Sequence, residues 1–294
     1  MRKITVLSGK GGVGKSSITA SLAVLLARKK RIVVADCDVD APNLALVLGL
    51  KDKDFTKWEK VQTSEKAVIV KNRGISCERI EDLCYFNAIS CKNDKVIIDK
   101  LLCEGCGVCE LASPKGAIKL VKVNNGKIGF GQTRYGFKIL SGQLKIGESG
   151  SGKIVTLVRN KAEEIAKKEN AEIILADAAA GIGCPVIASV VGSDYVVAVT
   201  EPTPSAFSDL SRALSVVRHF GIKAGIVINR YDINKPFTKK IEEYARKENI
   251  RVLGKIPYDK RFVDALVHLR PVVVYDGSFD KIFIEILKKI IGGG

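Results

Sequence analysis

The N-terminal segment constrains the fold of this chain more than any other part of the sequence. The apolar run Ile4 to Leu7 predicts a short buried strand, and the amphipathic stretch Ser16 to Lys30 predicts a helix. Between them the loop Gly9 to Ser16 reads GKGGVGKS, which matches the pattern G-x-x-x-x-G-K-[ST]. A match that directly follows a strand and directly precedes a helix predicts a P-loop, and this context disfavours the alternative of a plain glycine turn.

The chemistry of the loop follows from its residue types. Glycines let successive backbone N–H groups curl around phosphates, and the helix N-terminus adds a positive dipole. Lys15 can reach the β- and γ-phosphate oxygens, and Ser16 can ligate Mg²⁺. We therefore predict ATP contacts from Gly11, Gly12, Val13, Gly14, Lys15, Ser16 and Ser17.

Further apolar runs recur along the chain with helical stretches between most of them. They are Ile32 to Ala35, Ile173 to Ala176, Val196 to Val199, Gly225 to Ile228 and Val252 to Ile256. This alternation predicts an α/β fold, a P-loop NTPase with a mostly parallel sheet flanked by helices. The apolar runs are far shorter than the roughly 20 residues that cross a bilayer, and no signal peptide is recognisable, so we expect a cytoplasmic protein.

The strand–helix alternation stops where the cysteines concentrate. Six of the eight cysteines lie between Cys77 and Cys109, and clustered cysteines in a long cytosolic chain favour metal binding over disulfides. We expect residues 1–70 and 126–294 to form the ATPase domain, and residues 71–125 to form a small inserted α+β domain. The glycine-rich stretch Gly126 to Lys153 is expected to be an irregular return into the main domain.

Three cysteines carry an iron–sulfur signature. Cys103, Cys106 and Cys109 have the C-x₂-C-x₂-C spacing that wraps three thiolates around one face of a cubane cluster. Bacterial ferredoxins continue with x₃-C-P, whereas this chain has Ser113 followed by Pro114. In two-cluster ferredoxins the fourth cysteine of each run ligates the other cluster, so the loss at Ser113 affects only the opposite site.

An internal repeat identifies the fourth ligand. Residues 84–89 and 113–118 both end in Ala-Ile, 29 residues apart, which makes Cys84 the counterpart of Ser113. The counterparts of the three clustered cysteines are Gly74, Cys77 and Ile80. One site is thus degenerate, and we predict a single 4Fe–4S cluster held by Cys84, Cys103, Cys106 and Cys109, with Cys77 and Cys91 left over. Zinc is the competing interpretation, although structural zinc usually takes paired C-x₂-C knuckles.

Beyond the P-loop, the chain resembles the MinD/ParA family of deviant Walker A ATPases. The second loop lysine, Lys10, is typical of that family. Residues 36–44 (DCDVDAPNL) are similar to its switch I, and residues 177–181 (DAAAG) are similar to its switch II. Residues 200–203 (TEPT), 229–232 (NRYD) and 256–259 (IPYD) match further family segments. The insert looks like the ferredoxin domain found inside some MinD-superfamily ATPases.

This resemblance implies a mechanism. Two protomers would face each other across two ATP molecules as a homodimer, and Lys10 of each would reach the partner's phosphates. Asp38 would orient the attacking water, so the implied catalytic residues are Lys10, Lys15 and Asp38. Asp36 and Asp177, with Ser16, would hold Mg²⁺. Asn229 and Pro257 would contact adenine.

Cys184 lies seven residues after Asp177. In the nitrogenase iron protein, a relative on the same fold, a cysteine just after switch II ligates a cluster shared across the dimer axis. By that resemblance Cys184 is a speculative metal ligand at a dimer interface, and a buried helix-start cysteine is the alternative.

Two functions remain open at this stage. The leading hypothesis is an ATP-driven dimeric switch coupled to the cluster for electron transfer or metal-cofactor handling, with a redox or cluster-accepting protein as partner. The alternative is a positioning protein that binds DNA or membrane when ATP-loaded. The formal charge of +16 and the apolar stripe Phe279 to Ile290 favour that alternative, which we otherwise rank second because such a stripe usually packs on its own sheet.

Overall fold

A computed structural model of the chain describes residues 1–72 and 74–292. Contacts between Cα atoms divide the chain into two compact units. Unit 1 comprises residues 1–59, 128–143 and 151–294, and unit 2 comprises residues 60–127 and 144–150. The described residues of the expected insert lie in unit 2. None of the described helices is both long enough and apolar enough to cross a bilayer.

A nine-stranded sheet with the order β13-β12-β11-β1-β10-β2-β9-β8-β3 organises the main fold. Every strand predicted from an apolar run is present, and parallel pairing joins all neighbours from β13 to β9. The predicted α/β architecture with a mostly parallel sheet is therefore confirmed. The strands are β1 (Arg2–Ser8), β2 (Ile32–Cys37), β3 (Phe55–Val61), β8 (Gly126–Gln132), β9 (Lys138–Leu144), β10 (Ile173–Ala180), β11 (Tyr195–Thr200), β12 (Ala224–Asn229) and β13 (Arg251–Ile256).

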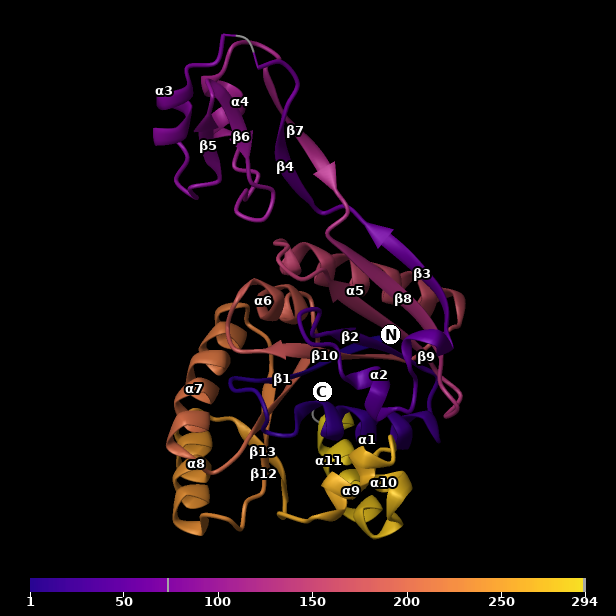
Figure 1. Cartoon of the computed structure of the whole chain (residues 1–294). Helices are drawn as coiled ribbons and strands as arrows, with labels where there is room; N and C mark the ends of the chain where they lie inside the picture. The colour runs from indigo at the N-terminus through magenta and orange to yellow at the C-terminus, as the bar shows by residue number, and fades with distance from the viewer. Residues whose placement is uncertain (73, 293–294) are drawn as a thin grey trace. The chain divides into compact units, whose positions relative to one another are not determined.

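Helices cover both faces of this sheet (Figure 1). One apolar core joins alternate strand residues to α1 (Lys15–Ala27), α2 (Leu44–Val47), α9 (Arg261–Val267), α10 (Val272–Tyr275) and α11 (Asp280–Ile291). A second core joins the opposite strand residues to α6 (Cys184–Val190), α7 (Pro204–His219) and α8 (Lys235–Lys247). The helix α5 (Ser151–Lys168) packs near β2 and α6. Strands buried on both faces explain the continuous apolar runs in the sequence.

The apolar stripe near the C-terminus faces the interior. Phe283, Ile286, Leu287 and Ile290 of α11 are buried in the first core, where Ile286 packs close to Gly254 of β13. The stripe therefore packs on its own sheet, as an amphipathic surface helix of a globular protein does.

The expectation of an irregular return over Gly126 to Lys153 was wrong. This stretch forms strands β8 and β9 and then enters α5. Its glycines are sites of close packing, since a Cβ on Gly129 would lie 2.7 Å from Phe55 and 2.8 Å from Trp58. A Cβ on Gly142 would likewise lie 2.7 Å from Val39. Glycine at these positions leaves space for neighbouring side chains to pack against the sheet, as glycine within strands often does.

Unit 2 contains six elements in the order β4, α3, β5, β6, α4, β7. Strands β4 (Ser64–Ile69) and β7 (Ile118–Val123) pair antiparallel, and so do β5 (Ile89–Lys92) and β6 (Lys95–Ile98). The short helices are α3 (Cys77–Asp82) and α4 (Val108–Ala112). The core of the unit is a small cluster that includes Ala67, Ile80, Ile89 and Ile118, against which several cysteines pack.

Candidate functional site

The P-loop joins β1 to α1 and is shaped by glycines that could not be replaced without displacement. A Cβ on Gly9 would lie 2.2 Å from the backbone carbonyl of Asp209, so the loop approaches α7 at backbone contact distance. Gly14 precedes α1 in the left-handed conformation, and its Cβ would lie 2.5 Å from Nδ2 of Asn229. These positions need glycine for close approach and for positive φ.

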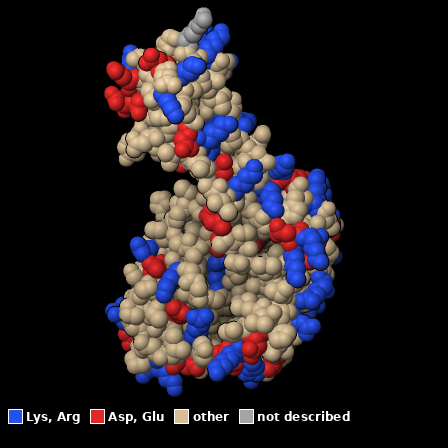
Figure 2. All heavy atoms as spheres, in the orientation of Figure 1, with Lys and Arg blue, Asp and Glu red and all other residues tan. Residues whose placement is uncertain are grey.

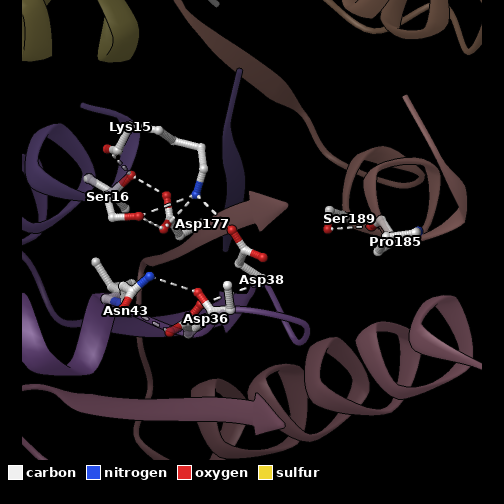
Figure 3. A network of polar contacts seen from close by, with 11 residues as sticks. Lys15, Ser16, Asp36, Asp38, Asn43, Asp177, Pro185 and Ser189 are labelled. Atoms are coloured by element: carbon white, nitrogen blue, oxygen red, sulfur yellow. Dashed lines mark hydrogen bonds and ion pairs between the residues drawn. The ribbon is translucent and has the colours of Figure 1, made fainter. Parts of the chain in front are cut away.

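Lys15 is the centre of the polar network in this site. Its side chain is buried, with Nζ 2.8 Å from Asp177 Oδ2 and 3.9 Å from Asp38 Oδ2 (Figure 3). Ser16 Oγ donates to the same Asp177 Oδ2 at 2.7 Å, and Thr19 Oγ1 donates to Asp177 Oδ1 at 2.6 Å. Thr19 belongs to no motif in the sequence, although its position one helical turn after Lys15 places it on the same face of α1.

Asp36 lies at the end of β2, beside β10 and thus near Asp177. It is fully buried, and its carboxylate accepts hydrogen bonds from the backbone N–H of Asp38 at 3.3 Å and of Leu44 at 3.1 Å. These bonds hold the turn that follows β2, which includes the residues similar to switch I. The backbone of this turn therefore depends on the Asp36 carboxylate.

Asp177 and Asp38 share the Lys15 ammonium group, and Asp36 lies on the neighbouring strand beside Asp177. Burial and then the charge of Asp177 raise the pKa of Asp36 well above its ordinary value, although Lys15 opposes this shift. Burial raises the pKa of Asp38 as well. The pKa of Lys15 is also raised, because the attraction of Asp177 and the other carboxylates outweighs the penalty of burying the ammonium. The site therefore has an excess of acidic groups over cations, which favours uptake of a further positive charge.

Lys15, Ser16 and Asp38 line a cavity of about 580 Å³, whereas Asp36 and Asp177 lie behind its wall and do not line it. Its lining includes the predicted contacts Gly11, Gly12, Gly14, Lys15, Ser16, Ser17, Asp38, Asn229 and Pro257. Val13 is buried behind the loop, and its carbonyl accepts a 2.8 Å hydrogen bond from Asn229 Nδ2. Tyr258, Phe262 and Leu266 add an apolar wall. A larger hollow, of about 870 Å³ beside Arg2 and Tyr195, contains none of the predicted residues.

Lys10 stands apart from this network. It is half-exposed, and its Nζ lies 3.7 Å from Glu201 Oε1, while Arg230 donates to Glu201 Oε2 at 2.9 Å. Glu201 belongs to the segment TEPT and Arg230 to NRYD, and the sequence analysis assigned a role to neither. The structure thus connects Lys10 to the segments TEPT and NRYD through one carboxylate.

The four cysteines predicted to bind a cluster line one cavity of unit 2, although they come from two distant stretches of sequence. Cys84, Cys103, Cys106 and Cys109 all contribute to its wall. The backbone N–H of Ala88 donates to Cys84 Sγ at 3.3 Å, and that of Ala67 donates to Cys103 Sγ at 3.4 Å. Burial raises the pKa of Cys109, with neighbouring Cys103 and Cys106 contributing in the same direction.

Among the described residues, no group of three or more His, Cys, Asp or Glu side chains is arranged to hold a metal ion. A cubane cluster differs from a single ion because each of its four irons takes one thiolate, so its ligands surround a volume. The cavity that the four cysteines line measures about 20 Å³, which is room for about one water molecule, so the structure brings the four side chains together without an open space of a cluster's size.

Cys77 and Cys91 were expected to be left over, and this expectation was wrong. They form a disulfide with a Cα–Cα distance of 5.8 Å. In the repeat, Cys77 is the counterpart of Cys106, so the degenerate half of the unit carries a covalent link between α3 and β5. No pattern in the sequence predicts this pairing, because spacing alone cannot assign disulfide connectivity.

Comparison with known protein families decides the classification of the chain. The family model for the CobQ/CobB/MinD/ParA nucleotide-binding domain matches residues 4–272. The chain belongs to this family.

Several family members are similar over most of their length. The uncharacterized protein MJ0578 of Methanocaldococcus jannaschii is 40% identical over 80% of this chain and 81% of its own. An iron–sulfur cluster carrier protein of Pyrococcus abyssi is 25% identical over 98% of this chain and 85% of its own. The septum site-determining protein MinD of Pyrococcus horikoshii, solved in complex with Mg-ADP, has a TM-score of 0.58 at 19% identity, covering 98% and 95% of the two chains.

Within this CobQ/CobB/MinD/ParA chain, Cys184 occupies the start of α6, after β10. Its side chain is exposed, in contrast to the alternative of a buried helix-start cysteine. A Cβ on Gly152 would lie 3.1 Å from Cys184 Cβ, so α5 packs tightly behind it. Among the described residues, Cys184 belongs to no group of three or more His, Cys, Asp or Glu side chains that could hold a metal ion.

Proposed function

We propose that the chain is an ATP-hydrolysing switch that works as an ATP-dependent homodimer and couples its nucleotide state to one 4Fe–4S cluster in unit 2. The coupled task would be electron transfer or the handling of an iron–sulfur or related metal cofactor. The observation that carries the cluster half is that Cys84 and the trio Cys103, Cys106 and Cys109 line one cavity.

The nucleotide half rests on the charge balance around Lys15. The fully buried Asp177 and the partly buried Asp38 pair with a single ammonium group, and the fully buried Asp36 lies on the next strand beside Asp177. Magnesium prefers carboxylate, hydroxyl and phosphate oxygens, and it would supply the missing positive charge. Ser16, Asp36 and Asp177 are the residues that would hold it, and its chemistry would be to neutralise charge on the phosphates.

Lys10 and Asp38 supply the proposed chemistry of hydrolysis. Asp38 lines the cavity and would orient water. Lys10 is half-exposed and makes only a long ion pair with Glu201, so its side chain could swing out to the phosphates of a partner. Replacing Lys10 with Ala should preserve ATP binding and abolish hydrolysis and ATP-dependent dimerisation. Nucleotide binding by calorimetry and mass by analytical ultracentrifugation would test this; a monomeric enzyme with undiminished turnover would contradict it.

The order of elements in unit 2 supports a ferredoxin-like insert. The succession β4-α3-β5-β6-α4-β7 is the β-α-β-β-α-β order of ferredoxin-like folds. Each half of the repeat contributes one short helix, with Cys84 just after α3 and Cys109 within α4. Hydrogen bonds from backbone N–H groups to the cysteine sulfurs are a further feature by which proteins tune such clusters.

The experiment that tests both halves is anaerobic purification followed by iron, sulfide, zinc and nucleotide analysis. Four irons and four sulfides per chain are the expected result from this ligand set. Cys84→Ala should lose the brown cluster absorption, and Cys184→Ser should keep it because Cys184 is outside this ligand set and outside unit 2. Zinc in place of iron, or equal effects of the two substitutions, would overturn the assignment.

One observation still supports the alternative function, a positioning protein that binds DNA or membrane. The charge of +16 favours anionic partners, whereas the C-terminal stripe is buried and no longer favours a membrane. ATP-dependent sedimentation with DNA or liposomes at moderate salt, with no nucleotide effect on cluster reduction, would favour this alternative over the proposal.

A further inference from the structure

The wall of the cysteine cavity is apolar where it reaches the surface. Leu83, Phe86 and Val108 line the cavity with the cysteines and are exposed to 41%, 38% and 43% respectively. The ring of Tyr85, which is 90% exposed, packs edge-to-face on Phe86 with a centroid distance of 5.4 Å. We call Leu83, Tyr85, Phe86 and Val108 the apolar rim. Large aromatic side chains that remain exposed together mark contact surfaces.

One ligand reaches solvent inside this rim. Cys106 is the exposed member of the predicted ligand set, whereas Cys103 is buried and Cys84 and Cys109 are partly buried. The side of the cavity next to Cys106 is thus the least shielded path to a bound cluster. A partner that covered the apolar rim would come closest to the cluster at that point.

The charge around the rim is opposite to that of the whole chain. Residues 77–110 contain seven acidic and four basic residues, in a chain with a formal charge of +16. Glu81 and Asp82 directly precede the rim at the end of α3, and the exposed Glu104 lines the cavity itself. Figure 2 shows acidic side chains gathered over α3. A general solubilising charge does not explain a local reversal of sign.

From these observations we infer that the apolar rim, with Glu81, Asp82 and Glu104, is the docking face for an electron-transfer protein whose own contact surface is apolar and ringed by lysines. The inference rests on the proposed function and specifies its partner. An apolar centre excludes water between the two redox groups, and complementary charge around it accelerates encounter and sets orientation. The negative charges of Glu81, Asp82 and Glu104 would repel acidic redox proteins.

The probe for this face is a basic c-type cytochrome, whose haem edge is ringed by lysines, compared with the same protein after lysine acetylation. The chain is loaded with its cluster and reduced with a stoichiometric amount of dithionite. One electron then passes from the cluster to the ferric haem iron, with no proton or group transfer. We expect native cytochrome to be reduced at least about 10-fold faster than acetylated cytochrome at low salt, with the difference vanishing at high salt.

Two sets of variants localise the effect. Neutralising the docking face should slow reduction of native cytochrome at low salt by about 10-fold and leave the cluster absorption unchanged. The test variant carries Glu81→Gln, Asp82→Asn and Glu104→Gln. Its matched control removes the same charge from exposed positions of unit 1 and should react as the unmodified protein does. The control carries Glu164→Gln, Glu243→Gln and Glu285→Gln.

A readout independent of electron transfer is binding of zinc-substituted cytochrome by calorimetry. The test variant should bind more weakly than the control, and Tyr85→Ser should weaken binding even at high salt because it removes apolar contact. Equal rates with native and acetylated cytochrome, or equal affinities of test and control variants, would overturn the docking face. Failure to assemble any cluster would instead overturn the proposed function.

Discussion

The disulfide between Cys77 and Cys91 should carry much of the stability of unit 2. The two residues are 14 positions apart, so the bond closes a loop of about 15 residues. In the chain-entropy model such a loop contributes about 3 kcal/mol by restricting the unfolded state. Among its described residues, unit 2 has only a small apolar cluster with seven buried members. A loss of this size should therefore affect the whole unit.

Hydrogen exchange can measure this loss locally. In a Cys77→Ala/Cys91→Ala variant, the slow amides of β5 and β6 should exchange about 100-fold faster, since about 3 kcal/mol corresponds to two powers of ten in the opening equilibrium. The amides of β1 and β11 in unit 1 serve as the internal control and should be unchanged. A Cys184→Ser variant controls for loss of a cysteine elsewhere.

The bond itself is checked by alkylating the iron-free, denatured protein without reductant, which should leave two of the eight cysteines unmodified. If all eight are alkylated, the disulfide is not present in solution. If the bond is present but the exchange rates of β5 and β6 do not change on its removal, the entropic argument is refuted.

Three further predictions concern unit 1. Gly9→Ala should destabilise the protein by about 1–3 kcal/mol in urea unfolding, because the added Cβ would overlap the Asp209 carbonyl. Gly277→Ala is the control: it has open space around it and should change the free energy of unfolding by less than about 0.5 kcal/mol. Phe283→Ala should cost about 3–5 kcal/mol through loss of a buried ring, and a smaller loss would mean that the core collapses around it. Hydrogen bonds from Ser278 and the Arg261 guanidinium lower the pKa of Asp276 to about 2. The charged carboxylate therefore stabilises the fold at pH values above its ordinary pKa of 3.8, and that contribution is lost as the pH falls toward about 2. Asp276→Asn should therefore be less stable than the parent at neutral pH and match it near pH 2; a constant difference would contradict this assignment.

Sequence alone predicted the elements that depend on short-range patterns. The P-loop motif and the apolar runs identified every parallel strand from β13 to β2, because strands covered on both faces must be continuously apolar. Asp36, Asp177 and Asn229 were predicted from the resemblance to the MinD/ParA family, and the structure places all three at the carboxyl ends of parallel strands, which lie at one edge of the sheet.

Sequence rules failed where one residue type has two uses. Glycines over Gly126 to Lys153 suggested irregular structure, but Gly129 and Gly142 make room for side chains packed on β8 and β9. Thr19 carries no motif of its own, and its bond to Asp177 exists only because α1 lies against β10. Such contacts join residues that are far apart in sequence, and local patterns cannot report them.

The cysteines show the same division most clearly. Their spacing and the 29-residue repeat predicted which four belong together, because the C-x₂-C-x₂-C run groups three of them and the repeat points to Cys84 as the fourth. Only the tertiary structure decided that the four line one cavity, that Cys77 instead meets Cys91, and that the cavity mouth is apolar and acidic. Pairing of distant residues and exposure of a side chain are properties of the packed chain, so they are fixed only when the two halves of the repeat fold against each other.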